Sequence, residues 1–299
     1  MGTRMMSALA LPARRVWPAC GLVLAALGTG WAHAQEDVAA EPAVAASSAK
    51  VTKKDESRAF NYVVGALVAS SPDYAGGDGR TYRLRPAWAI EWGRFRLSTS
   101  RGNSMMGHGL ERRDSGASAT LAEGERFNLS ASLRIDKGRD DNDSPRLAGL
   151  PEVRSTLRGK LSAGYALTDR WALNTGLSQD LLGRDGGAQV SAGVGYTWPA
   201  TPSTKITWGA STSWGDGTYM RSHFGVPVGS SSGLAPFTPK AGIYSVDTGV
   251  DFMTALNRHW VVLGGVHFSQ LQGDARTSPV TVKPSGYSAS VGLAYRCCR

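Results

Sequence analysis

The stretch at residues 205–214, KITWGASTSW, alternates between two chemical faces with almost no exception. Successive side chains of an extended strand point to opposite sides, so such a stretch has one apolar face and one polar face. The apolar face contains Ile206, Trp208, Ala210, Thr212 and Trp214, and the polar face contains Lys205, Thr207, Gly209, Ser211 and Ser213. The pattern predicts a half-buried β-strand, which could belong to a soluble sandwich or to a membrane barrel.

The same alternation recurs along the chain from Phe60 to Tyr295, in about 12 segments. The expected strands cover residues 60–68, 82–92, 95–99, 115–121, 127–135, 153–165, 171–177, 190–198, 205–214, 244–252, 260–268 and 287–295. Pro86 cannot donate a ladder hydrogen bond, so it predicts a bulge in the second strand. Abundant glycine and scarce helix caps also favour β structure.

The connections between these segments alternate in length. Short turns are expected near residues 92–93, 122–125, 166–169, 199–203 and 253–257, and longer loops at 70–79, 101–114, 137–150, 180–186, 215–239 and 271–285. Aromatic residues gather toward the strand ends, as at Trp88 and Trp92, Tyr196 and Trp198, Trp208 and Trp214, and Tyr287 and Tyr295. Short periplasmic turns, long outer loops and aromatic girdles are typical of outer-membrane barrels.

We therefore predict an all-β fold, a transmembrane antiparallel up-and-down β-barrel of about 12 strands. After residue 34 the chain has no apolar run long enough for a membrane helix. A soluble exported β-protein is the alternative. In the barrel the polar face lines the interior, and the candidate lumen-lining residues are Arg83, Arg85, Glu91, Arg134, Arg154, Arg158, Lys160, Lys205, Asp247 and Asp251. Their net positive charge would favour anions, although paired charges could also plug the modest lumen.

The N-terminal segment has the three parts of a secretory signal. Arg4, Arg14 and Arg15 precede an apolar run, and Ala32-His33-Ala34 forms a cleavage site. We expect a signal peptide at residues 1–34, a flexible periplasmic tail at 35–59 and the barrel at 60–299. Without the signal the net charge is about +6 and the basic residues are dispersed, so a nucleic-acid partner is not expected.

Motifs for catalysis, cofactors or metals are missing from the sequence. There is no G-x-S-x-G nucleophile motif and no His or Cys pair with zinc spacing. His223 is the only suggestive candidate for a barrel hydrolase. The carboxylate-rich run 136–143 could hold calcium but lacks the EF-hand spacing, so a solvated, salt-bridged outer loop is the better interpretation. We expect no catalytic residue, no cofactor and no metal.

Several short motifs follow one another in a specific order along residues 60–295. They are Ser71-Pro72-Asp73-Tyr74-Ala75-Gly76, Leu147-Ala148-Gly149-Leu150, His223-Phe224-Gly225-Val226, Gly273-Asp274-Ala275 with Ser278-Pro279, and Gly292-Leu293-Ala294-Tyr295. This ordered set resembles the MipA/OmpV family of outer-membrane proteins. The chain departs from that family at its end, where an aromatic residue is usual and Arg296-Cys297-Cys298-Arg299 follows Tyr295.

The resemblance implies a barrel without enzymatic activity, located in the cell outer membrane in contact with lipid and lipopolysaccharide. It also implies a scaffold or interaction protein of cell-wall (murein) synthesis and hydrolysis, with a murein hydrolase or synthase as partner. The alternative function is a narrow, anion-preferring solute channel, because the expected polar face is basic.

Overall fold

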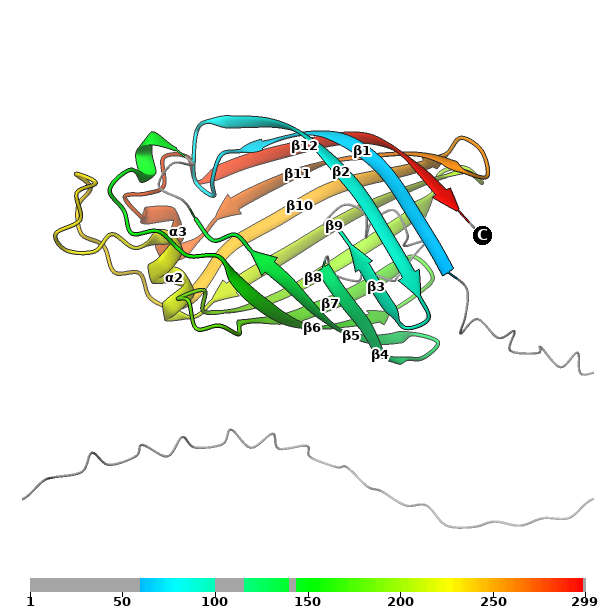
Figure 1. Cartoon of the computed structure of the whole chain (residues 1–299), viewed down its shortest axis with the longest axis horizontal. Helices are drawn as coiled ribbons and strands as arrows, with labels where there is room; N and C mark the ends of the chain where they lie inside the picture. The colour runs from blue at the N-terminus through cyan, green and yellow to red at the C-terminus, as the bar shows by residue number, and fades with distance from the viewer. Residues whose placement is uncertain (1–59, 100–115, 140–143, 298–299) are drawn as a thin grey trace, which may run out of the picture. The chain divides into compact units, whose positions relative to one another are not determined.

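The computed structural model describes residues 60–99, 116–139 and 144–297, and in them twelve strands form one closed antiparallel barrel (Figure 1). The strands are β1 (Phe60–Pro72), β2 (Arg80–Trp92), β3 (Phe95–Ser98), β4 (Gly116–Glu123), β5 (Phe127–Asp136), β6 (Thr156–Ala166), β7 (Trp171–Asp180), β8 (Ala188–Pro199), β9 (Thr204–Gly215), β10 (Gly242–Ala255), β11 (Trp260–Leu271) and β12 (Ser285–Cys297). Each strand pairs with its neighbours in sequence, and β12 closes onto β1. The predicted up-and-down barrel is confirmed.

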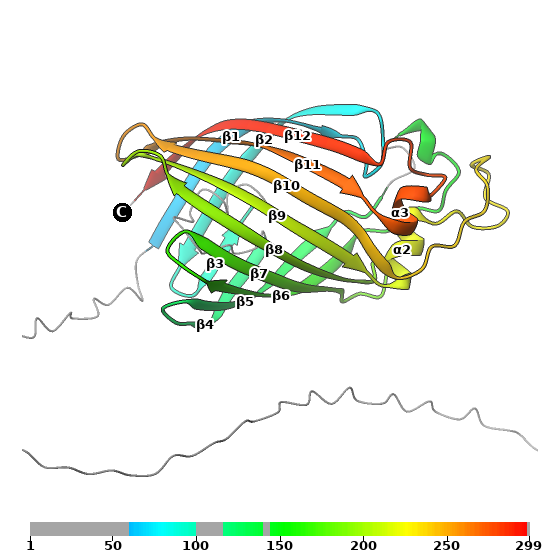
Figure 2. The same cartoon turned by 180° about the vertical axis from the view of Figure 1, so that it is seen from behind.

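The connections alternate in length as predicted. Short turns occupy residues 93–94, 124–126, 167–170, 200–203 and 256–259, and the longer described loops occupy 73–79, 181–187, 216–241 and 272–284. The long loops contain α2 (Gly217–Phe224) and α3 (Gly273–Thr277), and a 3₁₀ turn, η3 (Pro145–Leu147), lies between β5 and β6. Figure 2 shows both helices at the end of the barrel opposite the short turns. The expected signal peptide and tail, residues 1–59, lie outside the described part of the chain.

Both described ends of the barrel lie at the end with the short turns, where Tyr62 of β1 is paired with Cys297 of β12. In outer-membrane barrels this is the periplasmic end, so the long loops are on the outer side. None of the helices in the described ranges is long and apolar enough to cross a membrane.

The outward face of the strands is apolar along the barrel wall. In β10, for example, Val246 and Val250 point outward and are 44% and 45% exposed, whereas Asp247 and Asp251 lie on the interior face. Aromatic rings meet near the short turns, with 4.9 Å between the ring centroids of Trp171 and Tyr196. An apolar surface of this extent is unfavourable in water and favourable in lipid.

Two local expectations are wrong. The strand expected from Val153 begins at Thr156, because Val153 instead exchanges backbone hydrogen bonds with Arg139 in an isolated bridge, at N···O distances of 2.9 and 3.0 Å. Pro86 causes no bulge, since β1 and β2 keep one register through it. A proline is tolerated there because β3 pairs with β2 only from Ala89 onward, so β2 needs no donor at that position for β3.

Candidate functional site

Three basic residues project from the interior faces of two adjacent strands. Arg134 of β5 and Arg158 of β6 are directly opposite each other, and Lys160 lies two residues further along β6. Side chains directly opposite each other across an antiparallel pair approach to about 5 Å at Cβ, so like charges there repel unless they are compensated. The neighbouring groups show how this wall of the barrel accommodates them.

Arg158 is fully engaged by groups around it. Its Nε donates to Asp136 Oδ2 at 3.0 Å, and its two terminal nitrogens donate to the carbonyl oxygens of Gly186 at 2.7 Å and Gly187 at 3.2 Å. The Arg158 side chain is only 2% exposed. A buried guanidinium is stable only when its donors are satisfied, so this arginine has a structural role in fixing the 181–187 loop.

Asp180, the last residue of β7, folds the same loop. Its carboxylate accepts hydrogen bonds from the Thr156 hydroxyl and from the backbone nitrogens of Leu182, Arg184 and Gly186. Arg158 and Asp180 occupy opposite positions of the β6–β7 pair. The loop that follows β7 is therefore held from both strands.

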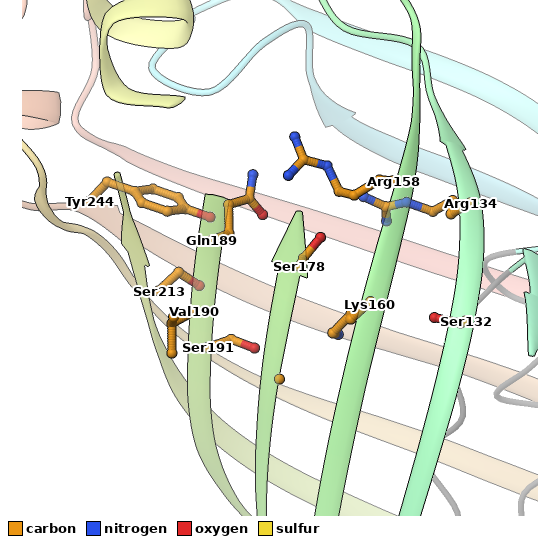
Figure 3. A pocket seen from close by; sticks show the side chains of 11 residues that line it. Ser132, Arg134, Arg158, Lys160, Ser178, Gln189, Val190, Ser191, Ser213 and Tyr244 are labelled. Carbon is orange, nitrogen blue, oxygen red and sulfur yellow. The ribbon is translucent and has the colours of Figure 1, made fainter. Parts of the chain in front are cut away.

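A cavity of about 220 Å³ lies against this wall, on the outer half of the barrel (Figure 3). It is lined by Ser132, Arg134, Arg158, Lys160, Gly176, Ser178, Gln189, Val190, Ser191, Ser213 and Tyr244. Gly176 makes room for a charged side chain, because a Cβ at this position would lie 2.6 Å from Cε of Lys160. A second cavity, of about 450 Å³, extends toward the short turns and shares Lys160 and Ser191 with the first.

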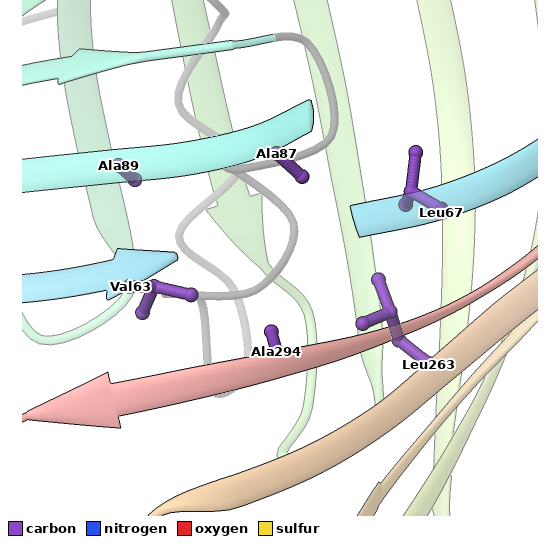
Figure 4. Close-up of a cluster of buried hydrophobic side chains, with 6 residues drawn as sticks. All are labelled: Val63, Leu67, Ala87, Ala89, Leu263 and Ala294. Atoms are coloured by element: carbon purple, nitrogen blue, oxygen red, sulfur yellow. The ribbon is translucent and has the colours of Figure 1, made fainter. Parts of the chain in front are cut away.

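The opposite wall is apolar inside as well as outside. Val63, Leu67, Ala87, Ala89, Leu263 and Ala294 form a buried cluster on the interior faces of β1, β2, β11 and β12 (Figure 4). Gly65 and Gly292 lie on the same face, and a Cβ on either would come within 2.7 Å of neighbouring backbone or side-chain atoms. Close packing therefore fills this side, and the two cavities lie along β4 to β10.

The other candidate lumen residues lie elsewhere. Near the short turns Glu91 pairs with Arg96 at 3.2 Å, and Lys205 is on the interior face of β9. On β10, Asp247 accepts a hydrogen bond from Ser245 at 2.9 Å, and Asp251 lies 3.0 Å from His267. The two β10 carboxylates therefore contact partners on their own side of the barrel instead of the basic residues of β5 and β6.

Three predicted arginines are solvent-exposed. Arg83 and Arg85 are on the interior-facing side of β2, opposite Ala69 and Leu67, but in the part of the strand beyond its pairing with β3. Arg154 stands before the first residue of β6 because of the Arg139–Val153 bridge, and thus belongs to the outer loop and not to the barrel wall.

The family-motif residues of the long loops gather at the outer end into one packed assembly, which we call the outer cap, whereas the motif Gly292–Tyr295 lies in β12 toward the short turns. The outer cap comprises the described residues of the loops 73–79, 137–155, 216–241 and 272–284. Leu147, Leu150, Val226 and Val280 form one buried cluster, with Tyr74, Leu234 and Phe237 packed against it, and Met220, Phe224, Leu271 and Ala275 form a second. Segments far apart in the sequence thus share hydrophobic cores above the barrel.

The first motif loop has a defined turn chemistry. Asp73 Oδ1 accepts from the Tyr74 nitrogen at 3.0 Å, and the Tyr74 hydroxyl donates to the Val280 carbonyl at 3.0 Å. Gly76 has φ +96°, and its carbonyl accepts from the nitrogens of Val282 and Lys283 at 2.8 and 3.0 Å. Only glycine adopts that φ without strain. The contact between the β1–β2 loop and the β11–β12 loop therefore requires a glycine at position 76.

The later motifs are tied together by hydrogen bonds between side chains and backbone groups. The Ser278 hydroxyl donates to the Phe224 carbonyl at 2.6 Å, and Arg146 donates to the Pro279 carbonyl at 2.8 Å. Asp274 accepts from the Lys240 nitrogen at 2.8 Å. Ser71 and Pro72 belong to the end of β1, Gly273 begins α3 with φ +52°, and Gly225 follows α2 where a Cβ would lie 2.3 Å from the Arg221 carbonyl oxygen.

Arg139 is a cap residue that the sequence did not single out. It is buried and donates to the carbonyls of His223 at 2.9 Å and Pro151 at 3.2 Å. In the sequence it is one charge in an acidic, polar loop, a setting that is typical of solvated arginines. No local signal distinguishes it.

The rings of His223 and Tyr219 pack against each other in α2 in a tilted arrangement, with 4.3 Å between their centroids. Burial, followed by the positive charge of Arg139, lowers the pKa of His223 to about 4. Burial raises the pKa of Tyr219 well above its usual value. Both groups are therefore neutral near pH 7. In the part of the chain that the structure covers, no three His, Cys, Asp or Glu side chains are grouped as a metal site would need, and residues 140–143 of the carboxylate-rich run lie outside it.

Solved structures similar to this chain include three outer-membrane barrels or channels. They are OmpT of Vibrio cholerae (TM-score 0.36, 8% identity, 80% of this chain and 97% of that chain), the CymD monoaromatic hydrocarbon channel (0.39, 10%, 81% and 89%) and the KdgM porin (0.36, 10%, 78% and 98%). At these scores they support no statement about function. No curated protein matches the sequence.

The family comparison is more specific than these structures. Residues 64–297 match the sequence profile of the family described as MltA-interacting protein MipA. That range includes the strands from β1 onward and all the motif loops of the outer cap. The chain is an outer-membrane β-barrel protein that belongs to the MipA family.

Proposed function

We propose that this protein is a non-enzymatic interaction protein of the outer membrane that docks a murein hydrolase or synthase at its periplasmic end. The observation that carries the proposal is the match over residues 64–297 to a family described as MltA-interacting. Export would depend on the expected signal peptide at residues 1–34. The expected tail at 35–59 would add a flexible periplasmic segment.

The short turns supply a basic surface for such a partner. Four of the five described short turns contain an exposed arginine, namely Arg94, Arg126, Arg170 and Arg258. Glu125 and Asp169 are in two of the same turns, so the rim is net basic. Charged rims act mainly by steering a partner of opposite charge and by fixing its orientation. A partner with an acidic face would suit this rim.

The outer cap supports docking at the periplasmic end. Its two buried clusters pack the described parts of the long loops against each other, so most of their apolar side chains are already used within the cap. Lipid and lipopolysaccharide would contact the apolar outward face. The aromatic residues near the strand ends suit the two membrane interfaces.

Site-specific photo-crosslinking tests the partner. A photoreactive residue at Asp169, in an exposed short turn, is expected to crosslink a murein hydrolase or synthase in intact cells. The matched control is the same residue at Val228, which is 87% exposed in an outer loop and should give no such product. Converting the four turn arginines to glutamate should weaken the interaction about tenfold. Failure to recover murein enzymes from Asp169 would refute the proposal.

The second candidate function is an anion-preferring solute channel. It is favoured by one observation, the two cavities that share Lys160 and Ser191 along a wall with basic residues. Planar-bilayer recordings of the refolded protein should then show a small anion-selective current, and Lys160→Glu should reduce that selectivity. A protein that inserts but conducts nothing would exclude the channel.

A further inference from the structure

The outer cavity has the composition of an anion-binding site. Three of its lining residues are basic and none is acidic. Most of the others present hydroxyl or amide groups, namely Ser132, Ser178, Gln189, Ser191, Ser213 and Tyr244. Guanidinium and hydroxyl donors around one space are suited to an oxyanion, because hydrogen bonds to an ionised acceptor are stronger than those to a neutral one.

Arg134 is the group available to such a ligand. Its guanidinium has five N–H donors, yet it makes no hydrogen bond or ion pair with any of the residues described, and it projects into the cavity (Figure 3). Asp136, two residues further along the same face of β5, is already bound by Arg158 at 3.0 Å and by the Gly138 nitrogen at 3.2 Å. The Arg134 guanidinium lies within electrostatic range of the Asp136 carboxylate, but its N–H donors have no hydrogen-bond partner among the described residues and are available to a ligand.

Ser178 provides an independent observation. It is only 6% exposed, it lines the cavity, and its hydroxyl has no hydrogen-bond partner within the described part of the chain. Buried hydroxyls are nearly always hydrogen-bonded, so an exception beside a cavity points to a group that occupies the cavity. Ser178 and Ser132 are both opposite Lys160, on the strands that flank β6, and Arg134 is one step further out on the same wall.

The shape of the cavity limits the ligand. About 220 Å³ is below the roughly 300–1,000 Å³ of sites for drug-sized ligands, so the occupant is small. Tyr244 forms part of the lining, and its ring packs against Tyr219 of α2, with 4.9 Å between the centroids. The cavity is thus covered on its outer side by the cap and continues toward the second cavity past Lys160 and Ser191.

We propose that the outer cavity binds a small hydroxylated carboxylate. The carboxylate pairs with the Arg134 guanidinium, and ligand hydroxyl groups bond to Ser178 and Gln189. The free donors of the Arg134 guanidinium select the anion, and the hydroxyl-rich wall selects a polar ligand body over an aliphatic one. This site does not depend on the docking of a murein enzyme or on conductance, so its test can fail while those proposals stand.

Gluconate is a suitable probe, because it combines one carboxylate with several hydroxyl groups. Binding to the refolded full chain in detergent micelles can be measured by isothermal titration calorimetry and by saturation-transfer NMR. We expect gluconate to bind, sorbitol of the same hydroxyl pattern to bind at least about tenfold more weakly, and acetate to bind more weakly than gluconate. Chloride at equal concentration should not displace gluconate.

Three variants assign the binding to this cavity. Arg134→Gln should weaken gluconate binding about tenfold or more, and Ser178→Ala by several-fold. Arg83→Gln removes an equal charge from the exposed part of β2 and should leave binding unchanged. Arg134 makes no hydrogen bonds with the described residues, so its variant should keep the heat-modifiable gel mobility of a folded barrel. Unchanged binding in folded Arg134→Gln, equal displacement by chloride, or no gluconate binding to the unmodified protein would overturn the proposal.

Discussion

Replacing Arg158 with methionine should release the 181–187 loop from its hydrogen bonds to the barrel wall. The substitution keeps the length and much of the apolar stem of the side chain, but removes all three hydrogen bonds, to Asp136, Gly186 and Gly187. Two carbonyl groups and one carboxylate then lose a donor. Because Arg158 is almost completely buried, water cannot replace it without a rearrangement of the loop.

The expected loss of unfolding free energy is about 3–5 kcal/mol, which is the range for removing one partner of a buried ion pair. The contributions of the two carbonyls alone amount to about 1–3 kcal/mol each if they stay buried. Asp136 is 24% exposed and keeps its hydrogen bond from the Gly138 nitrogen. The loss of its Arg158 partner should therefore contribute little to the loss of unfolding free energy. Arg158→Lys should recover part of the loss, since lysine keeps the charge but cannot reach three acceptors in the same geometry.

Urea unfolding in lipid vesicles, followed by tryptophan fluorescence, measures this loss. Asp136→Asn and the double variant complete a cycle, in which we expect a coupling of about 1–2 kcal/mol between the two residues. Proteolysis within residues 181–187 should accelerate in Arg158→Met. A loss below about 1 kcal/mol, or a double variant whose effect equals the sum of the single ones, would contradict a structural role for the Arg158 network.

Three further perturbations test the lipid face, the first motif and the cap. Val250→Arg places a charge on the outward face of β10 and should cost about 2–4 kcal/mol in vesicles, whereas no measurable loss would mean that this face does not contact lipid. Gly76→Ala forces a side chain into φ +96° and within 2.9 Å of Thr281, so it should destabilise the cap by about 1–3 kcal/mol, measured as faster hydrogen exchange at Val282. The pKa of His223 is about 4 in the folded cap and about 6.5 when the cap opens, so protons bind the open form more strongly. Cap stability should therefore be constant above pH 6.5 and fall by about 1–3 kcal/mol between pH 6.5 and 4. Hydrogen exchange of α2 across this range checks it, and His223→Gln should abolish the pH dependence.

The faces of the strands were readable from the sequence because side-chain direction in a strand has a period of two residues and is a local property. Trp208 and Val250 are on the outward face and Lys205 and Asp251 on the inward face, as the alternation predicted. The twelve strands, their order and the alternation of short and long connections follow from the same local pattern. The start of β6, which depends on the distant Arg139–Val153 bridge, and the bulge expected at Pro86 were wrong.

The pairing of interior charges depends on the closed barrel. The sequence places Asp247 and Asp251 on the same interior face as the basic residues, but strand order puts them on β10, and their contacts are with Ser245 and His267. Arg158 hydrogen-bonds to Asp136 on the adjacent strand, while Arg134 on that same strand has no hydrogen-bond partner among the described residues. Composition alone cannot distinguish these two arginines.

The sequence by itself thus determined that the chain is a membrane barrel and which side of each strand meets lipid, because alternation is set within a few residues. The tertiary structure decided which residues the motifs contact. The Tyr74 hydroxyl meets the Val280 carbonyl across 206 residues of chain, and Arg139 meets the His223 carbonyl across 84. Such contacts exist only once β12 has closed onto β1 and brought the outer loops over one opening, so the cap and the cavity beneath it are properties of closure and not of any segment.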